Sequence, residues 1–166
     1  MAELTALESK IGEVLGLAMA AQDATARVGK LVEDEGERDD LRAALQRMAK
    51  EAKETEERTT ELVSELEGKK TAILEKARET KHEAVEMMRT YLGDDADALD
   101  GFEFLTMAEA GEVGHWEVLG VLGTKAGKSN VQELVDWAIP IQQRHFQKAR
   151  EGSLKLAGQE DPDATG

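Results

Sequence analysis

The sequence lacks cysteine altogether and contains only 2 prolines, 4% aromatic residues and no long apolar run. Without cysteine, the chain forms neither disulfides nor thiolate metal sites, so a metal ion would need carboxylate, imidazole or amide ligands. No apolar run approaches the roughly 20 residues that span a bilayer, and no signal-peptide pattern opens the chain. We therefore expect a cytoplasmic protein that does not bind a membrane.

Basic residues are also scarce, because 21 Lys and Arg stand against 35 Asp and Glu, and the formal net charge is -14. Recognition of phosphate needs clustered Lys and Arg, so this balance argues against nucleic acid as the main partner. Acidic surfaces are often explained by solubility alone. A negative field also concentrates cations near the molecule, which would suit metal handling.

The sequence is rich in helical periodicity. Apolar residues recur at gaps of three and four, and the period-two alternation of strands is absent, so we predict an all-α fold. The expected helices cover residues 4–32, 37–67, 69–92, 101–124 and 130–156. A chain of 166 residues fits one domain. We expect a single helical-bundle domain over residues 1–157 and a disordered tail over residues 158–166.

The expected helix over residues 37–67 carries a regular heptad seam that begins at Leu41 and ends at Leu66. Such a seam is suited to a helical bundle or to a coiled coil. The centre of the seam is formed by Ala52, Thr55 and Thr59, which are small or polar. A core that becomes small and polar halfway along a helix has room for something other than apolar packing.

The most unusual pattern lies in the expected helix over residues 101–124. Leu105, Glu109, Glu112, Trp116 and Leu119 follow one another at gaps of four, three, four and three, so they share one helix face. Two carboxylates therefore interrupt an apolar stripe. An ionised carboxylate is rarely buried without a cation, a set of hydrogen bonds or a raised pKa. The pair is the strongest sequence signal for a functional site.

Three other expected helices also place polar residues on or beside their apolar stripes. Gln22 lies on the first helix, Glu51 or Glu54 beside the second, and Gln142 with His145 on the fifth. Carboxylates together with histidine in the core of a bundle are the ligand set of iron or manganese. We therefore expect a metal site in the core, with iron or manganese as the ion.

This arrangement resembles the ferritin-like superfamily, in which a Glu on one helix is followed by a Glu-x-x-His motif on the next, and the pattern is then repeated. In the second half of the chain, Glu109 is followed by Gln142 and His145, with Gln in place of the Glu of the motif. The stretches MAEAGEVGHWEVLGVLGTKAG and WAIPIQQRHFQKA are similar to bacterial ferritin-like stress proteins of the YciE/YciF type.

The first half departs further from that pattern, because Gln22 replaces the single Glu and Glu57, three residues after Glu54, replaces the His. The resemblance implies a ferritin-like four-helix bundle with an additional helix, residues 69–92, in the crossover. The candidate metal ligands are Gln22, Glu51, Glu54, Glu57, Glu109, Glu112, Gln142 and His145. A neutral Gln binds a hard cation more weakly than a carboxylate, so a mononuclear, altered or vacant site is an alternative to a di-metal centre.

The predicted function is metal binding in the bundle core. The resemblance implies that a redox-active metal would oxidise Fe(II) or consume a peroxide in stress protection, so catalysis is left open. We also expect a homodimer, because the apolar seams exceed what a slim bundle must hide.

Other interpretations remain open. The chain could be a non-catalytic interaction protein that keeps the scaffold without metal and pairs with another helix through the seam from Leu41 to Leu66. Glu109 and Glu112 could face a partner subunit, or pair with Lys or Arg, and His145 could form a core hydrogen bond with Gln142. A hydrolase or transferase that uses the paired carboxylates is less well supported, because no nucleophile or substrate-binding motif accompanies them.

Overall fold

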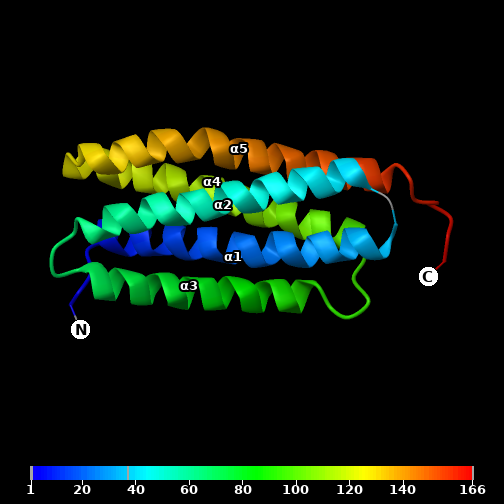
Figure 1. Cartoon of the computed structure of the whole chain (residues 1–166), viewed down its shortest axis with the longest axis horizontal. Coiled ribbons are helices and arrows are strands. Elements are labelled where there is room, and N and C mark those ends of the chain that lie inside the picture. Colours follow the sequence, from blue (N-terminus) through cyan, green and yellow to red (C-terminus); the bar gives the residue numbers. More distant parts are fainter. Residues whose placement is uncertain (1, 37, 166) are drawn as a thin grey trace.

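The computed structural model describes residues 2–36 and 38–165. Within these ranges it contains five α-helices and no β-strand (Figure 1). The helices are α1 (Ala6–Asp34), α2 (Asp39–Ser64), α3 (Lys70–Tyr91), α4 (Ala98–Ala126) and α5 (Ser129–Ala157). The prediction of an all-α fold is therefore confirmed for the described residues, and the helices occur in the expected order.

The predicted helix ends agree with the observed ones to within a few residues. The predicted start of the second helix at Glu37 lies outside the described residues, as do residues 1 and 166 at the ends of the predicted domain and tail. Residues 158–165 form turns after α5, and the disorder expected there stays a prediction. None of the described helices has an apolar stretch long enough to cross a membrane.

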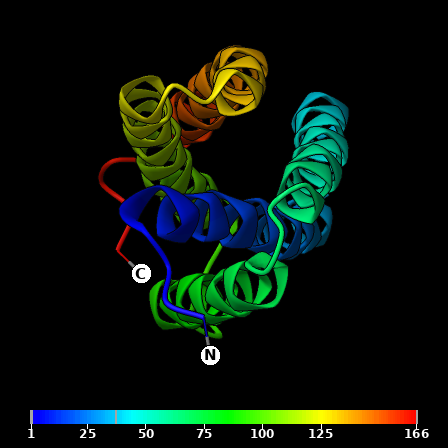
Figure 2. The same cartoon turned by 90° about the vertical axis from the view of Figure 1, so that its left-hand side faces the viewer.

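Helix α1 lies at the centre of the packing. It contacts α2, α3 and α4, and α4 in turn packs closely along α5. Figure 2 shows α3 on one side of α1 and the α4–α5 pair on the other. Helices α2 and α5 contact each other much less. The result is bundle-like packing that is more open between α2 and α5 than elsewhere.

Two helix starts are set by a local sequence signal. The Thr5 side chain accepts a hydrogen bond from the backbone N–H of Glu8, and the Glu8 carboxylate accepts one from the backbone N–H of Thr5. Asp97 and Asp100 form the same reciprocal pair at the start of α4. This arrangement satisfies N–H groups that the first helical turn leaves without a partner. It fixes where α1 and α4, the two helices with the most buried residues, begin.

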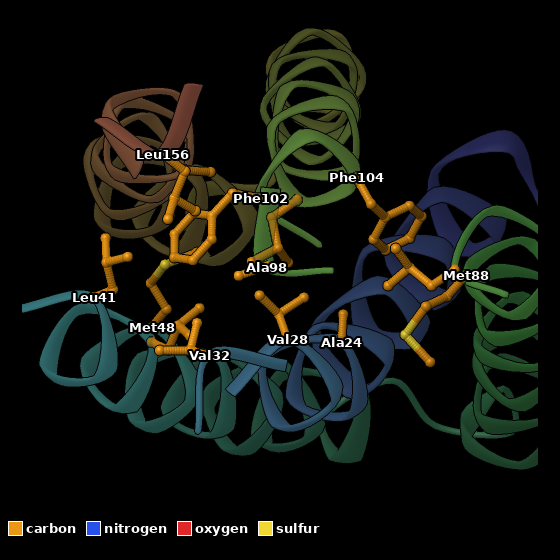
Figure 3. Close-up of a cluster of buried hydrophobic side chains, with 14 residues drawn as sticks. Ala24, Val28, Val32, Leu41, Met48, Met88, Ala98, Phe102, Phe104 and Leu156 are labelled. Atoms are coloured by element: carbon orange, nitrogen blue, oxygen red, sulfur yellow. The ribbon is translucent and has the colours of Figure 1, made fainter. Parts of the chain in front are cut away.

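The core consists of two apolar clusters that lie at different heights along the bundle. The first cluster surrounds Phe102, which Figure 3 shows next to Leu156 of α5 and Met48 of α2. The second cluster surrounds Trp116 and includes Ile73 of α3. On α2, α4 and α5, the residues of the two clusters are separated by a segment that contributes to neither. On these three helices, the buried polar residues lie in those intervening segments.

The heptad seam of α2 packs inside this chain. Its buried members are Leu41, Leu45, Met48, Ala52, Thr55, Thr59 and Leu62. Because the seam is covered by the other helices of the same molecule, it is not available to pair with a helix of another protein. The interaction surface that we considered for a metal-free scaffold protein is therefore not the one the fold exposes.

Two glycines allow neighbouring helices to approach closely. A Cβ atom on Gly16 of α1 would lie 2.4 Å from the carbonyl oxygen of Ala77 in α3. A Cβ atom on Gly152 of α5 would lie 2.3 Å from Cδ1 of Phe102, whose ring is fully buried. Side chains at these positions would push the helices apart. The glycines thus fix the spacing that surrounds the polar part of the core.

Candidate functional site

The buried polar side chains form one layer between the two apolar clusters, which we call the central polar layer. Its members are Thr25, Thr55, Thr59, Glu109, Glu112, Gln142 and His145. They come from α1, α2, α4 and α5. The burial that the sequence pattern predicted for the carboxylates of α4, and for the amide and imidazole of α5, is therefore observed.

Glu109 and Glu112 are the most unusual members of the layer. Their side chains sit between Leu105 and Trp116 on the buried face of α4, and the two residues are only 1% and 4% exposed. The Oε2 atom of each carboxyl group has no hydrogen-bond partner among the described residues. Burial of a carboxylate without donors is unfavourable, because water no longer solvates the charge. The described residues therefore leave these two oxygens in need of a proton or a cation.

Burial also changes the protonation of the pair. Loss of solvation raises the pKa of Glu109 from the ordinary 4.5 to about 8. Loss of solvation raises the pKa of Glu112 well above its ordinary value, and the nearby charge of Glu109 raises it further. A hydrogen bond with the Gln142 side chain opposes the shift at Glu112. The pKa of Glu109 therefore favours its protonated form at neutral pH when no cation is bound, and the pKa of Glu112 is shifted in the same direction.

His145 connects this pair to a more accessible carboxylate on α2. Its Nδ1 atom lies 3.8 Å from Oε2 of Glu109, and its Nε2 atom lies 3.4 Å from Oε1 of Glu51. Glu51 is also paired with Arg144 and with Arg47, whose Nε lies 3.2 Å from Oε1. Burial lowers the pKa of His145, and the Glu51 carboxylate partly opposes this shift. The imidazole is therefore neutral at pH 7 and can act as a ligand or as a hydrogen-bonding group.

Two clefts reach the layer from different sides of the bundle. One, with a volume of about 460 Å³, lies among α1, α3 and α4, and its lining includes Glu109 and Glu112. The other, of about 380 Å³, lies between α2 and α5, and its lining includes Glu51 and His145. Small ions therefore have a short path from solvent to the carboxyl groups.

In the α1–α2 pair, three of the candidate ligands are either hydrogen-bonded to another side chain or exposed to solvent. Gln22 of α1 is half-buried, and its Nε2 atom donates a hydrogen bond to Oε2 of Glu56 at 2.5 Å. Glu54 is exposed and pairs with Arg58, with 3.0 Å between Oε1 and Nη2. Glu57 is exposed as well. These positions leave Glu54 and Glu57 outside the layer, so they do not support the ligand role expected for those two residues, which stays a prediction.

The structure thus brings together a subset of the predicted site residues. That subset is Glu51, Glu109, Glu112, Gln142 and His145. Sequence reasoning missed Glu56, the α2 carboxylate that turns toward α1. A signal for it exists, because Glu56 follows Ala52 by four residues and precedes Thr59 by three, so it lies beside the buried face of α2.

The threonines of the layer are satisfied within their own helices. The Oγ1 atoms donate to backbone carbonyl oxygens four residues earlier, at 2.9 Å for Thr25 to Ala21, 2.9 Å for Thr55 to Glu51 and 2.7 Å for Thr59 to Thr55. These hydroxyl groups therefore need no ligand. The unsatisfied polar chemistry of the layer is confined to α4 and α5.

Within residues 2–36 and 38–165, no three His, Cys, Asp or Glu side chains are already arranged to hold a metal ion. The two nitrogens of His145 face different carboxylates, which explains why the ligands do not converge on one point. No protein-family model matches the chain, and no curated protein or solved structure is significantly similar to it. These comparisons therefore assign the chain to no family.

Proposed function

We propose that this protein binds a divalent cation, iron or manganese, in the central polar layer of a ferritin-like helical arrangement. The observation that carries the proposal is a set of three buried acceptor oxygens without donors: Oε2 of Glu109, Oε2 of Glu112 and Oε1 of Gln142. A buried acceptor that lacks a donor is rare in native proteins, because its desolvation is uncompensated. A cation bound among them would supply an interaction that the described residues do not give to these oxygens.

The chemistry of the donor set suits these metals. Glu109 and Glu112 would supply negative charge, His145 an imidazole, and Gln142 a weaker amide ligand or a hydrogen bond to a ligand. Hard oxygen donors with one imidazole favour Fe(II) and Mn(II) over softer ions. Glu51, which contacts the other ring nitrogen of His145, would orient that ring, as outer carboxylates commonly do in metal sites.

Binding requires rearrangement, because the ligands do not converge in the structure. Burial raises the pKa of both carboxyl groups, so a metal ion competes with protons for them. Both acids lie on adjacent turns of α4 and line the cleft among α1, α3 and α4, so an ion in this cleft would meet both of them.

The order of the helices supports the ferritin-like part of the proposal. Helices α1 and α2 pack on each other, as do α4 and α5, and α3 lies in the connection between the two pairs. Each pair contributes to the central polar layer. Oxidation of Fe(II), consumption of a peroxide and a role in stress protection stay predictions that depend on the metal.

Elemental analysis of protein purified without a histidine tag or chelator tests the proposal. Protein loaded anaerobically with Fe(II) or Mn(II) and then desalted is measured beside protein as purified. We expect about one metal equivalent per chain, and none in the Glu109→Gln/Glu112→Gln double variant. The substitution keeps the volume of both side chains and removes only their capacity for charge, so the fold is preserved.

The matched control is Glu54→Gln/Glu57→Gln. It removes the same charge from exposed positions of α2 and should leave the metal content unchanged. Absence of metal in the wild-type protein after loading, or equal loss of metal in both double variants, would overturn the proposed site.

A further inference from the structure

Helix α4 carries apolar residues on its outer side as well as on its buried side. Met107, Val118 and Val121 are 48%, 47% and 61% exposed. They lie on the side of the helix away from Leu105 and Leu119, and Met107 also lines the cleft among α1, α3 and α4. A helix that is apolar on all sides is normally covered on all sides. Among the described residues, no segment covers the outer side of α4.

Seven of the exposed residues of α4 form a stripe with a symmetric pattern, which we call the outer stripe. Its members are Glu103, Met107, Ala110, Gly114, Val118, Val121 and Lys125. The gaps between them are four, three, four, four, three and four residues, so the pattern reads the same from either end. Gly114 stands at its centre. Such a stripe is self-complementary when two copies lie antiparallel.

The charges at its ends complement each other in that orientation. In an antiparallel pair that crosses at Gly114, Glu103 of one copy lies level with Lys125 of the other. A parallel pair would instead put Glu103 beside Glu103 and Lys125 beside Lys125, which is repulsive. The outer stripe itself has one acidic and one basic residue, whereas the whole chain carries -14. It is therefore a region where two acidic molecules repel each other little.

The apolar positions match in the same register. Met107 lies level with Val121 of the second copy, and Ala110 lies level with Val118. Glu117, which is exposed beside the stripe, lies level with Gly111, so no like charges meet there. Both large apolar side chains at one end thus find an apolar counterpart at the other end.

The glycines point to close approach of another helix. A Cβ atom on Gly111 or Gly114 would meet no heavy atom within 4 Å in this chain, whereas one on Gly123 would lie 2.8 Å from a side-chain atom of Val131. Packing within the molecule therefore explains Gly123 but neither Gly111 nor Gly114. Glycine weakens the middle of a helix. A second backbone that passes close to α4 gives these residues a structural role.

We propose that the outer stripe of α4 docks a second copy of this chain, with the two α4 helices antiparallel and crossing at Gly114. The contact is isologous, because the same patch on both copies forms the interface and a twofold axis passes through the crossing point. The proposal does not depend on the metal site, since the carboxyl groups of Glu109 and Glu112 lie on the buried face.

Introduced cysteines test the register directly, because the natural chain has none. In the Met107→Cys/Val121→Cys double variant, the two positions are 14 residues apart on one helix. That spacing is about 21 Å, far too long for a disulfide within one chain. In the proposed dimer each cysteine lies level with the other cysteine of the second copy. We expect a covalent dimer after mild oxidation.

Each single-cysteine variant is the control, because its cysteine would face Val121 or Met107 rather than another cysteine. Single variants should remain uncrosslinked, and an equimolar mixture of the two should crosslink. If the single variants crosslink as efficiently as the double variant, the two helices are parallel rather than antiparallel. Absence of crosslinking in the double variant would contradict the proposed α4 interface.

Sedimentation of the unmodified protein tests the association itself. We expect a dimer at concentrations from about 10 to about 100 µM, and a monomer for Val118→Lys/Val121→Lys with an unchanged circular dichroism spectrum. Leu154→Lys on α5 is the matched control, because Leu154 is 65% exposed and lies outside the stripe. Glu103→Lys should weaken the dimer, and Glu103→Lys/Lys125→Glu should restore it. A monomeric wild-type protein, or equal dissociation by Leu154→Lys, would overturn the proposal.

Discussion

The two helix pairs of this bundle have similar lengths and similar spacing of polar residues, yet they satisfy those residues in different ways. In the α1–α2 pair, Gln22 is hydrogen-bonded to Glu56, and the buried threonines donate to their own helix backbone. In the α4–α5 pair, Glu109 and Glu112 keep an oxygen without a partner. The buried acceptor oxygens that have no hydrogen-bond partner are therefore found in the α4–α5 pair.

The difference follows from the kind of polar group that each pair buries. A hydroxyl group donates to the carbonyl oxygen four residues earlier in its own helix, so its hydrogen-bond partner is already present in the core. An ionised carboxylate only accepts, and the backbone N–H groups of its helix are already used. A carboxylate at the same depth must hold a proton, recruit a side-chain donor or bind a cation. Only the second pair contains such groups.

The largest expected effect comes from placing a carboxylate in the first pair. Thr59 is fully buried and satisfied, so Thr59→Asp would create a buried charge without a cation. We expect a loss of about 3–5 kcal/mol in the free energy of unfolding near pH 8. The loss should shrink near pH 5, because the new acid is then protonated. Denaturant unfolding at both pH values measures it; a loss that does not depend on pH would contradict the comparison.

The next effect is the pH dependence of the metal-free wild-type protein. The folded pKa of Glu109 is raised to about 8, whereas the unfolded chain titrates near 4.5. The folded state therefore binds more protons between these values, and stability falls as pH rises through this window. The slope is about 1.4 kcal/mol per pH unit for each such group. Glu112, whose pKa is also raised, acts in the same direction.

Guanidinium unfolding in the presence of a chelator measures this profile. The Glu109→Gln variant should flatten it, because one of the two buried acids no longer titrates. An exposed control, Glu57→Gln, should retain the wild-type slope. A wild-type stability that does not fall between about pH 5 and about pH 8 would show that the two acids are already ionised in the folded state.

A smaller effect is expected at the link between the two pairs. Glu51 of α2 raises the pKa of His145 of α5 against the larger lowering by burial. In Glu51→Gln that support is lost, so the pKa of His145 should fall further. NMR titration of the imidazole signals measures the shift, with Glu54→Gln as a control that should leave the pKa unchanged. An unaltered pKa in Glu51→Gln would mean that the contact across the bundle is absent in solution.

The smallest effect is expected from removing a satisfied hydroxyl group. Thr55→Val keeps the shape of a fully buried side chain and removes a hydrogen bond to its own helix. We expect a change within about 1 kcal/mol in the free energy of unfolding. Thermal or denaturant unfolding checks it. A loss as large as that of Thr59→Asp would mean that the threonines hold the layer together rather than fill it.

Much of the fold follows from periodicity. The gaps of three and four give all five helices, and the break in each apolar stripe marks the height of the central polar layer. Burial of Glu109, Glu112, Gln142 and His145 follows from the same pattern, because each stands where an aliphatic residue is expected. These are properties of one helix at a time, so one sequence is enough to see them.

The contacts between helices could not be read in this way. Helix α2 has acidic residues at 51, 54, 56 and 57, and neighbouring positions differ by about 100° around the axis. A small rotation of the helix decides which of them faces inward. Packing turns Glu51 toward His145 and Glu56 toward Gln22, and leaves Glu54 exposed. The cleft between α2 and α5 likewise depends on how far these two helices lie apart.

Titration of tag-free, metal-free protein with Mn(II) by calorimetry tests most directly that the unsatisfied acids of the second pair are a cation site. We predict one binding event per chain that is tighter near pH 8 than near pH 6, because protons compete for the same carboxylates. The Glu109→Gln/Glu112→Gln variant should give no binding. Absence of binding in the wild-type protein, or the same binding in the variant, would contradict the assignment.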